Sequence, residues 1–128
     1  MISHQAIERF ARETLGCHCP AEVFQQINCQ DKASLDKDSL RSLRINIGGR
    51  LLIYVVECLD IKVLASVVQH QAAQGKQERD SLGFNRFRLV ITTDKPDAIA
   101  EQAQAVFSGL NPDEKLHLHV IDRSDFPG

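Results

Sequence analysis

The first thirty positions carry apolar side chains at helical spacing in two short stretches. Ser3 can cap a first helix whose apolar positions recur every three or four residues: Ile7, Phe10, Ala11 and Leu15. Cys19 and Pro20 are expected to open a second helix with apolar residues at Val23, Phe24 and Ile27. The residues from Gln30 to Ser39 are polar and lack periodicity, so we expect an exposed connection there.

The middle of the chain has the pattern of a β-hairpin. Between Leu43 and Ile47, apolar residues alternate with polar ones, which is typical of a strand with one face in water. Gly48-Gly49 supplies the positive φ angles that a two-residue hairpin turn needs. The run from Leu51 to Val56 is apolar throughout, as expected of a strand that is covered on both faces.

The remaining residues alternate between helical and strand patterns. We expect a helix from Asp60 to Gly75, followed by a charged loop over residues 76–85. A second buried strand is predicted over Phe87–Thr93 and a last strand over Leu116–Ile121. Between them a helix begins near Pro96 and continues through Phe107.

These elements predict the class and the connectivity of the fold. The expected order is α-α-β-β-α-β-α-β, and two successive strand–helix–strand units imply three parallel strands. The hairpin adds one antiparallel strand at an edge. We therefore expect an α/β protein with a mixed, mostly parallel sheet of about four strands. It forms a single domain over residues 1–128, with a helical pair in residues 1–29 and the sheet and crossover helices in residues 40–122.

Composition narrows the functional classes. The 128 residues are 43% hydrophobic and 25% charged, with a formal net charge of −2, which argues against a general polyanion binder. One Tyr and no Trp leave few aromatic platforms for single-stranded nucleic acid. The chain shows no signal-peptide pattern and no apolar run of roughly 20 residues. We expect a cytoplasmic protein that does not bind membranes, and the sequence gives no strong signal for nucleic-acid binding.

The densest group of reactive side chains is Gly16-Cys17-His18-Cys19-Pro20. Two thiolates one residue apart can share a soft metal ion such as zinc, or act as redox or nucleophilic groups at a helix start. A disulfide between them would close a strained ring. Cys58 follows a buried strand and is the better third ligand, because Cys29 lies about one helix length from Cys19. We predict a site of Cys17, Cys19, Cys58 and His18, with His4 as an alternative to His18.

A structural role for the same cysteines is equally consistent with the sequence. Cysteine packs as a small apolar group, and the motif can be a tight turn between two helices. His117 and His119 present a second metal-ligand spacing on the last strand, and a strand with one wet face explains them as well.

The carboxyl ends of the parallel strands gather residues that can hold a divalent cation for phosphoryl chemistry: Glu57, Cys58, Asp60, Thr93, Asp94, Asp122 and Arg123. The alternative is that Asp60 and Asp94 only cap helices.

Three functions are compatible with these patterns. The first is an accessory protein that uses the Cys-x-Cys site for a soft metal or for thiol redox chemistry. The second is a non-enzymatic interaction module that pairs through the exposed hairpin edge, Leu43–Ile47, with a protein partner or a second copy. The third is a metal-dependent hydrolase or nuclease at the carboxyl edge. The sequence has no P-loop, G-x-G-x-x-G, G-x-S-x-G or H-E-x-x-H motif, and it leaves open whether the protein is an enzyme.

Overall fold

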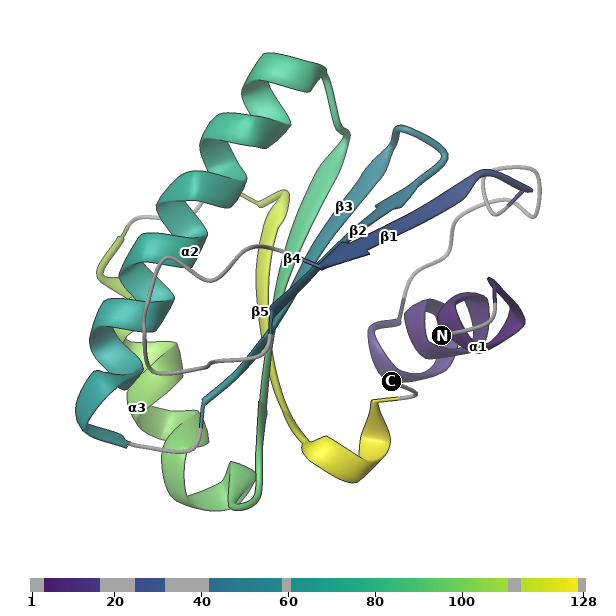
Figure 1. Cartoon of the computed structure of the whole chain (residues 1–128). Helices are drawn as coiled ribbons and strands as arrows, with labels where there is room; N and C mark the ends of the chain where they lie inside the picture. Colours follow the sequence, from purple (N-terminus) through teal and green to yellow (C-terminus); the bar gives the residue numbers. More distant parts are fainter. Residues whose placement is uncertain (1–3, 17–24, 32–41, 59–60, 111–113, 127–128) are drawn as a thin grey trace.

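The computed structural model shows one mixed sheet of five strands in chain order (Figure 1). It describes residues 4–16, 25–31, 42–58, 61–110 and 114–126. The strands are β1 (Ile27–Asp31), β2 (Ser42–Ile47), β3 (Leu51–Glu57), β4 (Arg86–Thr93) and β5 (Leu116–Asp122). β1, β2 and β3 form an antiparallel meander, whereas β3, β4 and β5 are parallel.

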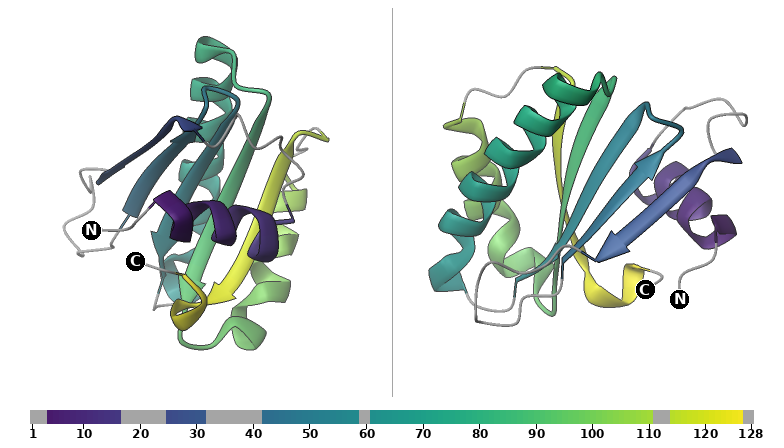
Figure 2. Two further views of the ribbon diagram at one scale, coloured as in Figure 1. Left: turned by 90° about the vertical axis from the view of Figure 1, so that its right-hand side faces the viewer. Right: turned by 45° about the horizontal axis from the view of Figure 1, so that its top comes forward.

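Helices cover both faces of this sheet. Both crossover helices, α2 (Ile61–Leu82) and α3 (Pro96–Ser108), lie on one face (Figure 1). The other face carries α1 (His4–Arg9), which continues into the π-helical segment η1 (Phe10–Thr14), and the short 3-10 turn η3 (Arg123–Asp125). Figure 2 shows α1 crossing this second face. Alternate residues of β3 and β4 therefore serve two different cores, whereas β2 contributes buried apolar residues only to the core beneath α1.

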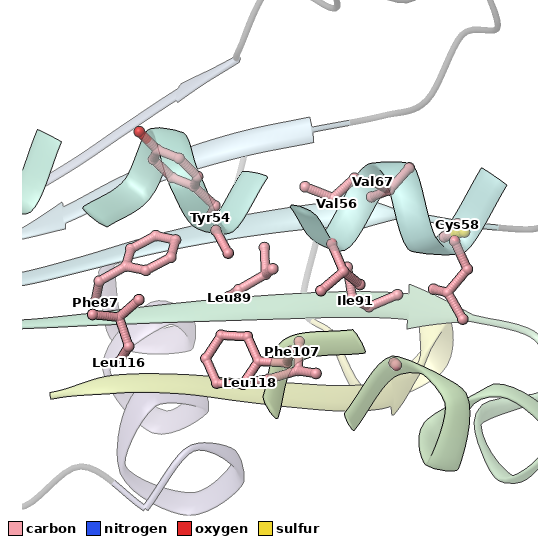
Figure 3. Packing of buried hydrophobic residues seen from close by; sticks show 14 of the residues in the cluster. Tyr54, Val56, Cys58, Val67, Phe87, Leu89, Ile91, Phe107, Leu116 and Leu118 are labelled. Carbon is pink, nitrogen blue, oxygen red and sulfur yellow. The ribbon is translucent and has the colours of Figure 1, made fainter. Parts of the chain in front are cut away.

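The larger core lies between the sheet and the two crossover helices. Figure 3 shows Tyr54, Phe87, Leu89 and Phe107 packed there, and Tyr54 meets the Phe87 ring edge-on at a centroid distance of 4.8 Å. The second core joins α1 and η1 to the opposite side of the strands, through residues that include Ile7, Phe10, Leu43, Ile45, Ile53, Val55 and Val90. The apolar run of β3 serves both cores, as its continuous hydrophobicity predicted.

The fold class and the parallel strands are confirmed. Gly48 and Gly49 have φ angles of 61° and 70°, as the hairpin turn requires. The sequence pattern predicts about four strands and the sheet has five. The difference is β1, because Ile27 belongs to a strand rather than to the end of a second helix. Ile27 pairs with Ile47 and points into the core beneath α1. The sheet therefore begins within residues 1–29, where the sequence pattern predicts a helical pair.

This extra strand also changes the position of the hairpin. β2 is hydrogen-bonded to β1 on one side and to β3 on the other, so Leu43–Ile47 is not an exposed edge. The prediction that Leu43–Ile47 forms a free edge is wrong, because β1 already occupies its hydrogen-bonding groups. Association with a protein partner or a second copy stays a prediction. The edge on this side of the described sheet is β1.

Helix α2 extends beyond Gly75 and includes most of the residues that were predicted to form a loop. Gly75 faces the sheet, where an added Cβ would lie 2.1 Å from the Phe87 ring. The helix ends instead at Gly83, whose φ is 76°. The N–H groups of Gly83 and Phe84 both donate to the Arg79 carbonyl, which is the geometry of a glycine C-cap. Gly75 is thus a packing residue, and Gly83 terminates the helix.

Candidate functional site

A cavity of about 490 Å³ lies where the parallel strands end, on the face that carries α1 and η3. Three carboxylates line it, and each follows or ends a different parallel strand: Glu57 in β3, Asp94 after β4 and Asp122 in β5. The prediction that the carboxyl ends bring these acids together is confirmed. The other lining residues in the described part of the chain are Leu43, Val55, Thr92, Arg123, Ser124 and Phe126.

Arg123 is the cation of this group. Its Nε lies 2.9 Å from Oδ1 of Asp94, and its Nη1 lies 3.5 Å from Oε1 of Glu57. The Arg123 side chain is 44% exposed, so water screens both ion pairs. Asp94 does not cap α3: the N-cap position is Lys95, whose N–H donates to the Thr93 hydroxyl at 3.4 Å. Asp94 pairs with Arg123 instead.

Asp122 caps η3, the turn that contributes Arg123 and Ser124 to the cavity lining. Its Oδ1 accepts hydrogen bonds from the backbone N–H of Ser124 at 2.9 Å and from the Ser124 hydroxyl at 2.8 Å. These bonds, together with the charge of Arg123, lower the pKa of Asp122. The carboxylate is therefore ionised at neutral pH. With Glu57, Asp94 and Arg123 it gives the described part of the cavity lining a formal excess of two negative charges.

An apolar wall faces these charges. Leu43 and Val55 come from neighbouring positions of β2 and β3, which are paired in the sheet register. Phe126 follows η3 and packs edge-on against Phe10, with ring centroids 5.1 Å apart. The contact holds the residues after η3 against η1. Leu43 lies at the cavity because β2 pairs with β3, and Phe126 because it packs against Phe10. Both contacts join segments that are separated in the chain, so the spacing of residues in the sequence does not predict them.

The acidic edge does not form a metal site in the part of the chain that the structure describes. No group of three or more His, Cys, Asp or Glu side chains is arranged to hold a metal there. The Arg123 guanidinium pairs with two of the three acids and supplies the positive charge that an ion would otherwise provide. Asp60, the remaining acid of the predicted cation site, lies outside the described residues.

The predicted cysteine site is described at only one of its four positions. Cys17, His18 and Cys19 lie outside the described residues. Cys58 is 1% exposed and belongs to the core beneath α2 and α3 (Figure 3). The segment η1, which precedes Cys17 in the chain, packs on the opposite face of the sheet. Cys29 is exposed on β1. The site of Cys17, His18, Cys19 and Cys58, with zinc or another soft metal, stays a prediction.

His117 and His119 do lie on one face of β5, as their alternation predicted, but arginines face them. Nη1 of Arg86 lies 3.3 Å from Nε2 of His117, and Nη1 of Arg88 lies 2.9 Å from Nε2 of His119. Two guanidinium groups at this distance repel a metal cation. The sequence carried the signal for this arrangement, since Arg86-x-Arg88 has the same alternation as His117-x-His119 on the adjacent strand.

Comparisons with protein-family models, with curated proteins and with solved structures find no match to this chain. Among the described segments, no helix is both long and apolar enough to cross a bilayer. The functional assignment therefore depends on the geometry of the sites themselves.

Proposed function

We propose that this protein binds a small organic cation, an aliphatic amine or guanidine compound, in the cavity at the carboxyl ends of its parallel strands. One observation carries the proposal. The cavity combines three carboxylates and an apolar wall, and among the described residues that line it Arg123 is the one cationic side chain. An amine or guanidinium group complements this charge, and an attached alkyl chain complements the wall.

The two parts of the cavity suggest how such a ligand lies. Its charged group occupies the region between Glu57 and Asp94. In the absence of the ligand, the guanidinium of Arg123 pairs with both of these carboxylates. Its alkyl chain lies against Val55 and Phe126. Partly exposed ion pairs contribute about 1 kcal/mol or less each, so the apolar contact and the combined charges act together. We expect a dissociation constant of roughly 0.1–1 mM.

Isothermal titration calorimetry with agmatine tests this proposal, because agmatine joins an amine to a guanidinium through a short alkyl chain. Butyrate and butanol are matched probes with a negative and a neutral end group. We expect heat of binding with agmatine only. Glu57→Gln removes one carboxylate and should weaken binding about fivefold. Glu101→Gln on the exposed side of α3 is the control and should leave the affinity unchanged.

Arg123→Gln distinguishes this proposal from anion binding at the same place. Removing the guanidinium leaves Glu57 and Asp94 available to the ligand, so agmatine should bind about threefold more tightly. If Arg123 were itself the ligand-binding group, this substitution would abolish binding and butyrate would bind to the wild-type protein. Either of those results contradicts the proposal.

A further inference from the structure

A second charged group lies on the same face of the sheet, at the amino-terminal halves of β4 and β5. Arg86 and Arg88 alternate on β4, and His117 and His119 alternate on β5. In the register of the parallel pair, Arg88 is opposite His117 and Val90 is opposite His119. The four side chains therefore form a two-by-two array, and each arginine reaches the imidazole next along the neighbouring strand.

Arg88 is the most buried residue of this array. It is only 8% exposed, whereas Arg86 is exposed and both histidines are half-buried. The Nε of Arg88 is buried and has no hydrogen-bond partner among the described residues. A buried donor in this condition costs about 1–3 kcal/mol, and more when the group is charged. A ligand that accepts a hydrogen bond from Nε removes this cost.

The surroundings of Arg88 favour an acceptor with negative charge. Within the described segments, the ion pairs of the chain do not include Arg86 or Arg88. The Arg88 Nη1 contact goes to an imidazole instead of a carboxylate. Burial and the positive charge of Arg88 lower the pKa of His119 to about 4, so its ring is neutral at neutral pH. Its Nε2 then accepts from Arg88 and its Nδ1–H remains a donor.

From this array we infer a binding site for a phosphate group, with Arg88 as the buried anchor and Arg86, His117 and His119 around it. The array presents two guanidinium groups and two imidazoles, which is more donor capacity than the two oxygens of a carboxylate can use. A phosphate has enough oxygens for them, and the planar fork of arginine matches its geometry. Arg86 and His117 form the exposed side from which the ligand enters. This site is separate from the cation-binding cavity and does not depend on it.

Titration with inorganic phosphate at constant ionic strength and neutral pH tests the inference, followed by thermal unfolding and by the NMR signals of the His117 and His119 rings. We expect a saturable rise in the unfolding temperature and shifts of both ring signals. Arg86→Gln should weaken phosphate binding about fivefold, and Arg88→Gln at least about tenfold, because charge-assisted bonds are the stronger ones. Arg12→Gln, which removes a half-exposed arginine of η1 on the same face, is the matched control and should bind like the wild-type protein.

If Arg88→Gln fails to fold, Arg86→Gln and His117→Gln test the phosphate site instead. Both residues lie on the more exposed side of the array, so their substitution should leave the protein folded. A phosphate monoester should bind like inorganic phosphate, and acetate should bind much more weakly. The inference is overturned if phosphate has no saturable effect, or if these variants respond as strongly as the wild-type protein. Binding of an oligonucleotide without any response to inorganic phosphate would also overturn it.

Discussion

The close approach of α2 to the sheet depends on a residue that has no side chain. Gly75 lies over the Phe87 ring, where an ideal Cβ would lie 2.1 to 2.4 Å from three ring atoms. The ring cannot move away easily, because Tyr54 packs edge-on against it from β3. Glycine in a helix interior normally costs about 1 kcal/mol relative to alanine, so packing overrides helix propensity at this position.

Gly75→Ala should therefore destabilise the protein, although alanine favours helices. Overpacking a tight core costs about 1–3 kcal/mol, and we expect a net loss at the upper part of this range, because the ring must shift. Urea unfolding measures the change. The double variant Gly75→Ala with Phe87→Leu supplies space for the new methyl group, so its loss should be smaller than the sum of the two single losses. Additive losses would show that Phe87 is not what excludes a side chain.

At the scale of elements, a polar network joins α2 to two strands. Arg44 on β2 donates to Glu78 on α2 through Nε, at 3.0 and 2.9 Å to the two carboxylate oxygens. The hydroxyl of Tyr54 on β3 donates to the same carboxylate. Burial, then the hydrogen bond and charge of Glu78, raise the pKa of Tyr54. The phenol therefore keeps its proton and acts as a donor within the network.

Glu78→Gln tests how much this network contributes. The Arg44 and Glu78 side chains are 18% and 25% exposed, so the arginine would keep a largely buried charge with a weaker acceptor. We expect a loss of about 1–3 kcal/mol in the free energy of unfolding. Glu101→Gln, on an exposed part of α3, should change it by less than about 0.5 kcal/mol. Equal effects of the two substitutions would mean that the network does not stabilise the docking of α2.

The same elements show what sequence patterns can and cannot predict. The hairpin was predictable, because alternation and the two turn glycines act locally. β1 was not, because Ile27 fits a helical spacing with the residues before it and Cys29 is exposed. The sequence pattern places the end of α2 too early, because a glycine commonly ends a helix. The reason for Gly75 is instead its contact with Phe87, which only the structure shows.

The sequence also predicts some features of the candidate site and not others. Glu57, Asp94, Asp122 and Arg123 were predictable as neighbours, since the ends of parallel strands meet at one edge. Their chemistry was not, because it depends on the ion pairs of Arg123. Phe126 and the burial of Arg88 both depend on contacts between segments that are far apart in the chain.

On the scale of the whole molecule, charge is separated along one face of the sheet. The carboxylates lie at the carboxyl ends of β3, β4 and β5, and the arginine–histidine array lies towards the amino-terminal ends of β4 and β5. The strands that carry both groups are continuous, so the separation is fixed by the register of the sheet. The array also couples the stability of the fold to pH, through the half-buried ring of His119.

Acidification should destabilise this protein in the range between the two pKa values of His119. The pKa is about 4 in the folded protein, because of burial, Arg88 and His117, in that order. It is about 6.5 in an unfolded chain. Between these values the unfolded state binds a proton that the folded state does not, so stability is complete above pH of about 6.5 and falls as the pH drops towards 4. At pH of about 5 the loss should be roughly 1–2 kcal/mol, since the ring is partly exposed.

His119→Gln isolates this contribution, because glutamine keeps an acceptor for Arg88 but cannot take up a proton in this range. Urea unfolding at neutral pH and at pH of about 5 should give a smaller difference for this variant than for the wild-type protein. Carboxylates also titrate towards the acid end, but they do so equally in both proteins and cancel in the comparison. His70→Gln on the exposed face of α2 is the matched control and should keep the wild-type pH dependence. If His119→Gln keeps it as well, the ring of His119 takes up a proton as readily in the folded protein as in the unfolded chain, and the array does not couple stability to pH.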